Sequence, residues 1–114
     1  MPVTGFHALF HTSEPEALRA LLGEAFGWES IDVGEGWLIF ALPPGEIAVH
    51  PGDTARHELS FFCDDLESTM SDLVAKGVEF DGEPVDEGYG LVATMVLPGG
   101  VRTLLYEPRH ETIA

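Results

Sequence analysis

Apolar residues recur every three or four positions between residues 13 and 27, which is the spacing of a helix with one buried face. Ser13 fits the N-cap and Pro15 fits the first turn. Gly27 predicts the end of the helix, because glycine readily adopts the left-handed backbone that follows a last turn. The apolar stripe of this helix consists of Leu18, Leu21, Leu22, Ala25 and Phe26.

The second half of the chain predicts a similar helix, which starts at Asp64 or Asp65, ends at Gly77 and carries the apolar stripe Leu66, Met70, Leu73 and Val74. Short runs rich in branched and aromatic residues flank both helices, and Gly- and Pro-containing turns separate them, so these runs predict strands. The strands span residues 3–12, 30–33, 37–42 and 46–50 in the first half and residues 57–63, 78–80, 91–97 and 101–107 in the second. Each half is thus predicted to run strand, helix, strand, strand, strand.

The two halves share more than their element order. His7 and His57, fifty residues apart, each open an apolar run that an acid follows seven residues later, at Glu14 and Asp64. A glycine lies twenty residues after each histidine. This internal repeat predicts one domain, residues 1–114, built from a first module over residues 3–51 and a second over residues 56–108. Duplicated modules commonly pack against each other, so their equivalent histidines are expected to approach one site.

Composition narrows the expected setting of the protein. A chain of 114 residues with 45% apolar composition fits one domain with a real core. Its formal net charge of −15 repels phosphate backbones and anionic lipids, so neither nucleic acid nor a membrane is an expected partner. Cys63 is the single cysteine, and the sequence shows neither a signal peptide nor an apolar run long enough to span a bilayer. A cytoplasmic location is therefore expected.

Histidine and carboxylate residues at the strand ends are the candidates for metal chemistry. Alternate side chains of a strand share a face, so His7 faces the same way as Leu9 and His11, and His57 the same way as Phe61. The last predicted strands of the two halves end on His50 and Glu107. Imidazole and carboxylate together suit Fe, Mn, Zn, Co or Ni. A hydrogen-bonded structural histidine is the alternative interpretation for any one of these residues.

With these features the chain resembles the vicinal oxygen chelate superfamily, which includes glyoxalase I, extradiol dioxygenases and bleomycin resistance proteins. The resemblance rests on the histidine that opens a strand before each acid-capped helix, and on a closing strand from Gly100 to Glu107. It implies an α+β fold, in which two βαβββ modules form a partly open curved mixed sheet. It also implies a divalent metal held by His7, His50, His57 and Glu107.

The resemblance implies two kinds of function. One is a divalent-metal-dependent lyase, isomerase or ring-cleaving dioxygenase that acts on a small neutral or aromatic oxygen-chelating substrate, with Glu107 as the catalytic residue. The alternative is a metal-free protein of the bleomycin-resistance type that sequesters a small molecule or drug, for which a cationic compound is also suitable. Trp37, Phe61 and Tyr89 are the candidate substrate-binding residues, and a homodimer is implied by analogy. A ferredoxin-like module with a similar element order is the remaining alternative.

Overall fold

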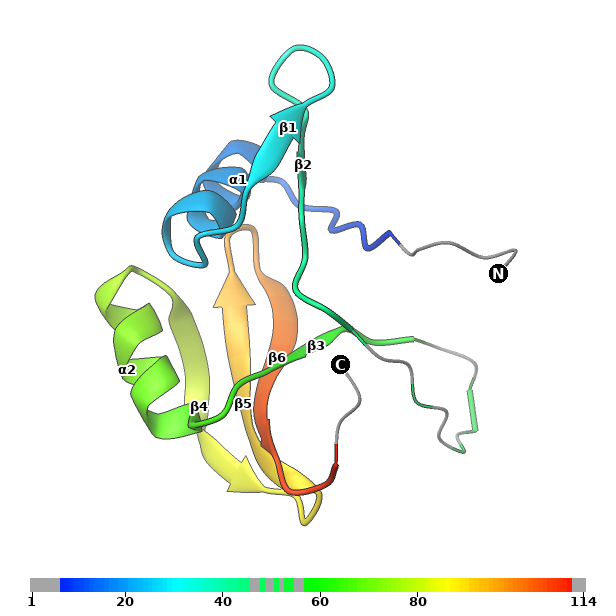
Figure 1. Cartoon of the computed structure of the whole chain (residues 1–114), viewed down its shortest axis with the longest axis vertical. Coiled ribbons are helices and arrows are strands. Elements are labelled where there is room, and N and C mark those ends of the chain that lie inside the picture. Colours follow the sequence, from blue (N-terminus) through cyan, green and yellow to red (C-terminus); the bar gives the residue numbers. More distant parts are fainter. Residues whose placement is uncertain (1–6, 46–47, 49–50, 52, 55–56, 112–114) are drawn as a thin grey trace.

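A computed structural model of the protein describes residues 7–45, 48, 51, 53–54 and 57–111 (Figure 1). The first half contains α1 (Pro15–Glu24), β1 (Ser30–Asp32) and β2 (Leu38–Phe40). The second half contains β3 (Ser60–Phe62), α2 (Leu66–Ala75), β4 (Glu79–Asp86), β5 (Gly90–Leu97) and β6 (Val101–Pro108). Neither helix of this described part is long and apolar enough to cross a membrane.

The main sheet has the strand order β3-β6-β5-β4, with β3 parallel to β6 and the other neighbours antiparallel. A separate antiparallel pair, β1-β2, extends away from it at the top of Figure 1. Both helices pack on one face of the main sheet, where their apolar stripes meet the buried positions of β5 and β6. The expected α+β class with a partly open mixed sheet is confirmed.

The core lies between the two helices and this sheet face. Met95 of β5 is 0% exposed, and Leu66 at the start of α2 is 1% exposed. Thr103 and Leu105 of β6 are buried on the same face, whereas their neighbours Leu104 and Tyr106 are only partly buried. This alternation follows from the strand period of two and leaves the second face of the main sheet uncovered by helices.

The observed N-cap residues of the two helices agree only in part with the predicted ones. The N-cap of α1 is Glu14, with Pro15 in the first turn, so the assignment of Ser13 as the cap is wrong. The side-chain acceptor at the start of this helix belongs to Thr12, whose hydroxyl oxygen accepts the Glu14 N–H at 3.1 Å. In α2 the N-cap is Asp65, whose side chain accepts the Ser68 N–H at 3.1 Å.

Several predicted strands differ from the observed structure, either in length or because the segment is not a strand. A strand was predicted over residues 3–12, but residues 7–12 form none. The strand predicted over residues 46–50 lies mostly outside the described residues. Segment 7–12 is instead attached to the β5–β6 turn, where the Thr12 hydroxyl donates to the Pro98 carbonyl at 2.8 Å. Strand β4 is longer than expected because it continues through Gly82, whose positive φ of 77° accompanies an irregularity in pairing with β5.

Candidate functional site

A cavity of about 690 Å³ lies between the first half of the chain and the near edge of the main sheet. Segment 7–12 and α1 form two of its walls, β2 and residues 41–45 form a third, and Leu59 and Phe61 contribute from the second half. One face of α1 supplies Pro15, Leu18, Arg19 and Leu22, which is the i, i+3, i+4, i+7 spacing of a helix. The cavity is therefore made by packing the two halves together.

Aromatic rings contribute to the walls of this cavity beside more numerous aliphatic side chains. Trp28 and Phe61 lie with their ring centroids 5.3 Å apart, and Phe26 supports Trp28 from behind at 4.9 Å in an edge-to-face arrangement. Phe10, Trp37 and Phe40 add three further rings to the lining. Rings held in this way present flat apolar surface at low conformational cost, so the walls suit a ligand with planar rings.

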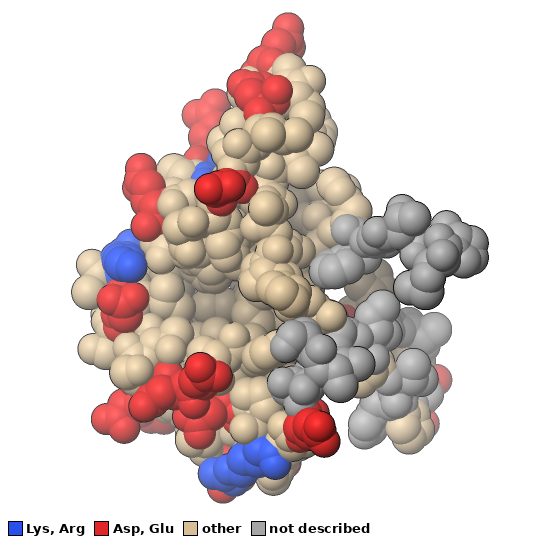
Figure 2. All heavy atoms as spheres, viewed as in Figure 1, with Lys and Arg blue, Asp and Glu red and all other residues tan. Residues whose placement is uncertain are grey.

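Of the residues that the structure describes, four with strong polar groups line the cavity: His7, His11, Thr12 and Arg19. Among the described residues no aspartate or glutamate lines it, although the chain contains twenty acids. Figure 2 shows acidic side chains around the outline of one face and a mostly uncharged middle. The guanidinium carbon of Arg19 lies 5.9 Å from the ring centroid of Trp37, a cation–π distance.

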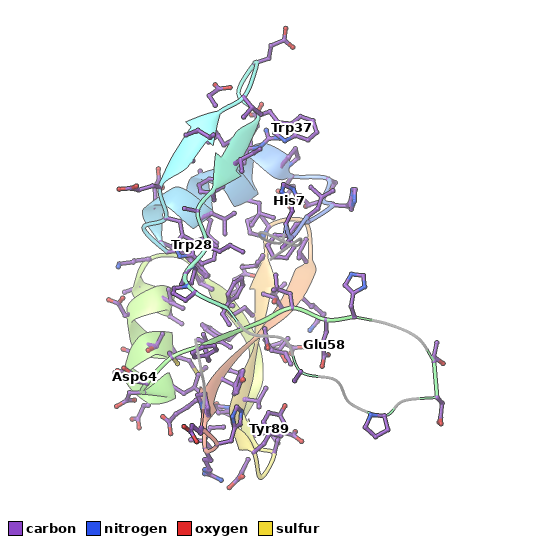
Figure 3. All side chains as sticks on the ribbon, turned by 45° about the vertical axis from the view of Figure 1, so that its right-hand side comes forward. His7, Trp28, Trp37, Glu58, Asp64 and Tyr89 are labelled. Carbon is purple, nitrogen blue, oxygen red and sulfur yellow. The ribbon has the colours of Figure 1, made fainter. Side chains whose placement is uncertain are left out.

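The structure separates the residues that the sequence suggested for substrate binding. Trp37, which is 58% exposed, and Phe61 line the cavity together with His7. Tyr89 lies elsewhere, in the turn between β4 and β5, where its ring is 5.9 Å from that of Tyr106. Figure 3 shows His7 and Trp37 in the upper part of the molecule and Tyr89 near the bottom.

Glu107, the proposed metal ligand and catalytic residue, lies on the helix-covered face of β6. Its Oε1 accepts the backbone N–H of Leu66 at 3.0 Å, at the first residue of α2. A carboxylate there satisfies one of the free N–H groups of the helix and interacts favourably with the helix dipole. Nearby, burial raises the pKa of the Cys63 thiol above its usual range; the Thr69 hydrogen bond opposes this shift and the charge of Glu107 adds to it.

The four proposed metal ligands are only partly described. His50 lies outside the described residues, His57 is exposed, and His7 lines the cavity whereas Glu107 does not. Over residues 7–45, 48, 51, 53–54 and 57–111, no group of three or more His, Cys, Asp or Glu residues is placed to hold a metal ion. The described donors thus do not fit a metal, and the four-residue site stays a prediction.

Arg19 was not among the site residues predicted from the sequence. The feature that could have suggested it is its spacing: it lies four residues after Pro15 and three before Leu22, at the border of the apolar stripe. Most helix-border arginines are solvated surface residues, so the spacing alone does not distinguish this one.

Solved structures with the same fold share little sequence with this chain. An antibiotic binding protein from Streptomyces sp. CB03234, TnmS3, is 22% identical, with a TM-score of 0.67 over 95% of this chain and 98% of that one. A lactoylglutathione lyase from Agrobacterium tumefaciens is 13% identical, with a TM-score of 0.65 over 93% and 95%. A superfamily member from Sphaerobacter thermophilus is 16% identical, with a TM-score of 0.63 over 93% and 98%. A search of curated proteins gave no match.

A family model matches almost the whole chain, over residues 3–113. Its extent covers both helices and all of the described strands, so it confirms the resemblance drawn from the two histidine-led modules rather than the ferredoxin-like alternative. The protein belongs to the Glyoxalase/Bleomycin resistance protein/Dioxygenase superfamily.

Proposed function

We propose that this protein binds a small aromatic molecule in the cavity and sequesters it without a metal. The observation that carries the proposal is the cavity itself, about 690 Å³ in volume and walled by aromatic and aliphatic side chains. Sites for small organic ligands commonly have volumes of about 300–1,000 Å³, mostly apolar walls and a few placed polar groups. The position of Glu107 also supports this choice, because its carboxylate is engaged at the start of α2.

The similarity to an antibiotic binding protein supports the same proposal. That protein covers nearly the same length of chain, and its described property is binding. At 22% identity the similarity shows the fold alone, so the nature of the ligand has to come from the cavity of this chain.

A metal-dependent lyase, isomerase or dioxygenase is the second candidate. One observation favours it: His7, one of the four ligands that the resemblance implies, lines the cavity, so its imidazole lies beside the space a substrate would occupy. The metals that the resemblance implies, Fe, Mn, Zn, Co or Ni, would supply a Lewis acid only if further donors completed the site. Such a site also requires donors from the part of the chain around His50.

We also propose that the protein is a homodimer. The second face of the main sheet is not covered by either helix, and it carries the aromatic rings of Phe62 and Tyr106, 6.0 Å apart, beside the half-exposed Tyr89. Apolar sheet faces that carry no helix are commonly interfaces. Sedimentation equilibrium of the full chain checks this, with a monomeric mass as the contradicting result.

Thermal shift with a panel of aromatic compounds, in the presence and absence of EDTA, tests the binding function. We expect stabilisation that EDTA does not change and that Trp37→Ala reduces. Val85→Ala is the matched control, since Val85 is similarly exposed at 53% and does not line the cavity. The metal content of untagged protein is measured in parallel by elemental analysis. Stabilisation that appears only with added metal, and is lost in His7→Ala, would support the enzyme instead.

A further inference from the structure

We infer that the cavity selects planar aromatic anions, meaning ring systems with one carboxylate or ionised phenolic group, and that Arg19 recognises the negative charge. This inference rests on the proposed binding function and names the ligand class of the same cavity. It differs from the expectation that net charge alone suggests, which is a preference for cations. The difference follows from where the charges lie.

Acidic residues give the molecule its net charge but do not line the described walls of the cavity. Charges on an exposed surface are largely screened beyond about 8 Å at physiological ionic strength. The potential inside the cavity is therefore governed mainly by the groups in its own walls. Those groups are one arginine, two histidines and a threonine, and none of them carries a negative charge. Of the acids that the structure describes, those that come near Arg19 are Glu16 and Glu35, which line a smaller hollow together with it, but neither forms an ion pair with it.

Arg19 differs from the other basic residues that the structure describes. Lys76, Arg102 and Arg109 each pair with an aspartate, at 3.3, 2.7 and 2.7 Å. Arg19 has no carboxylate within ion-pair distance among the described residues. Its guanidinium instead lies near the face of Trp37, and the residue is half-buried at the cavity wall. The fork of a guanidinium matches a carboxylate, so Arg19 offers an anion site that no described side chain fills.

The aromatic walls define the rest of the ligand. Trp28 and Phe61 are fixed against each other, and Trp37 lies beside Arg19, so a flat ring can pack on aromatic surface while its charged group reaches the guanidinium. A cationic ring system would find no carboxylate in the described walls and would lie close to the charge of Arg19.

Three probes with the same ring system isolate the charge: anthracene-2-carboxylate, anthracene-2-carboxamide and anthracen-2-ylmethylammonium. Dissociation constants are measured with the full chain by energy transfer from tryptophan to anthracene. We expect the carboxylate to bind about tenfold more tightly than the amide, as a charge-assisted hydrogen bond in a half-buried site predicts. The ammonium probe is expected to bind most weakly.

Variants assign this preference to Arg19. Arg19→Gln should weaken the carboxylate probe about tenfold and leave the amide within about twofold, since the amide depends on the walls and not on the charge. Arg19→Lys should restore part of the preference. Arg102→Gln changes the net charge equally at an exposed pair with Asp81, away from the cavity, and should leave the preference unchanged.

Two results would overturn the inference alone. One is equal or tighter binding of the ammonium probe, and the other is an equal loss of carboxylate and amide affinity in Arg19→Gln. In both cases the proposed binding function would stand, because the amide probe reports the cavity itself. If none of the three probes binds, the binding function and this inference both fail.

Discussion

The carboxylate of Glu107 and the backbone N–H of Leu66 lie 3.0 Å apart and join two parts of the chain separated by 41 residues. Leu66 is the first residue of α2 and is almost fully buried, whereas Glu107 lies near the end of β6. The hydrogen bond therefore fixes the start of a core helix to the closing strand of the sheet. A residue that the sequence suggested for metal chemistry has a structural partner in the folded chain.

Glu107→Ala should lower the free energy of unfolding by about 1–2 kcal/mol, because it leaves a helix-end N–H without its acceptor. Glu107→Gln keeps an acceptor oxygen and should lose less. Urea denaturation measures both changes. The control is Glu87→Ala at an exposed turn position, for which we expect a change within about 0.5 kcal/mol. Equal losses in Glu107→Ala and Glu87→Ala would contradict the role assigned to this hydrogen bond.

Gly99→Ala should detach segment 7–12 from the β5–β6 turn. A Cβ at Gly99 would collide with the Thr12 side chain, and the Gly99 N–H also donates to Glu14 at 2.8 Å. Gly100→Ala is the matched control, because it too has a positive φ but no heavy atom lies within 4 Å of the added Cβ. Both variants carry about 1 kcal/mol of backbone strain. Only Gly99→Ala should also weaken ligand binding, measured by thermal shift; equal behaviour would show that the attachment has no effect on the cavity.

Met95→Ala should lower the free energy of unfolding by about 2–5 kcal/mol, since Met95 is fully buried in the core cluster to which both helices contribute. Val96, the next residue of β5, points to the opposite face and is only partly buried. We expect Val96→Ala to cost less than half as much. Equilibrium unfolding in urea compares the two, and a larger loss at Val96 would mean that the two sheet faces are assigned the wrong way round.

The Cys63 thiol should react slowly with iodoacetamide at neutral pH. Its pKa is raised mainly by burial, so the fraction of reactive thiolate is smaller than in an exposed cysteine. As pH rises above the ordinary value of 9.0, the unfolded thiol ionises before the folded one, and stability should fall. Mass spectrometry of alkylation in buffer and in denaturant checks the first expectation. Faster reaction in the folded protein would refute it.

Asp86 should contribute to the acid dependence of stability. Its hydrogen bond from Arg109, with a second from the Gly88 N–H, lowers the pKa of the carboxyl. The folded form keeps its charge to lower pH than the unfolded chain, so this contribution is present above the ordinary value of 3.8 and is lost as pH falls below it. Asp86→Asn and Arg109→Gln should both flatten the acid limb of a plot of urea midpoint against pH. An unchanged limb in either variant would contradict the pairing.

The helices and the last two strands could be predicted because their signals are local. Apolar spacing identified both helices, and the runs of residues 91–97 and 101–107 became β5 and β6 almost unchanged. The cap of α1 was misplaced by one residue because Thr12 satisfies the Glu14 N–H, a contact that depends on the turn geometry before the helix. Strand pairing of residues 7–12 needs a partner strand, and an apolar run by itself does not provide one.

The candidate site was harder to predict, because its walls come from both halves of the chain. The alternation of side chains along a strand correctly placed Glu107 on the same face as Leu105. This alternation does not say which face of the sheet the helices cover. The role proposed for Arg19 depends on which of the acids line the cavity, and no local pattern in the sequence records that. The aromatic residues Trp37 and Phe61 were suggested from type alone.

Segment 7–12, α1 and β2 form most of the cavity, and they rest on a sheet that is complete within the second half of the chain. Opening of the first half, by release of Thr12 from Pro98, would therefore abolish the cavity while leaving the β3-β6-β5-β4 sheet paired. Local opening and ligand binding are then competing equilibria, and any molecule that occupies the cavity slows hydrogen exchange in α1 before it affects β5. The affinity of the cavity for a ligand is thus also a measure of how stably the first half of the chain packs on the second.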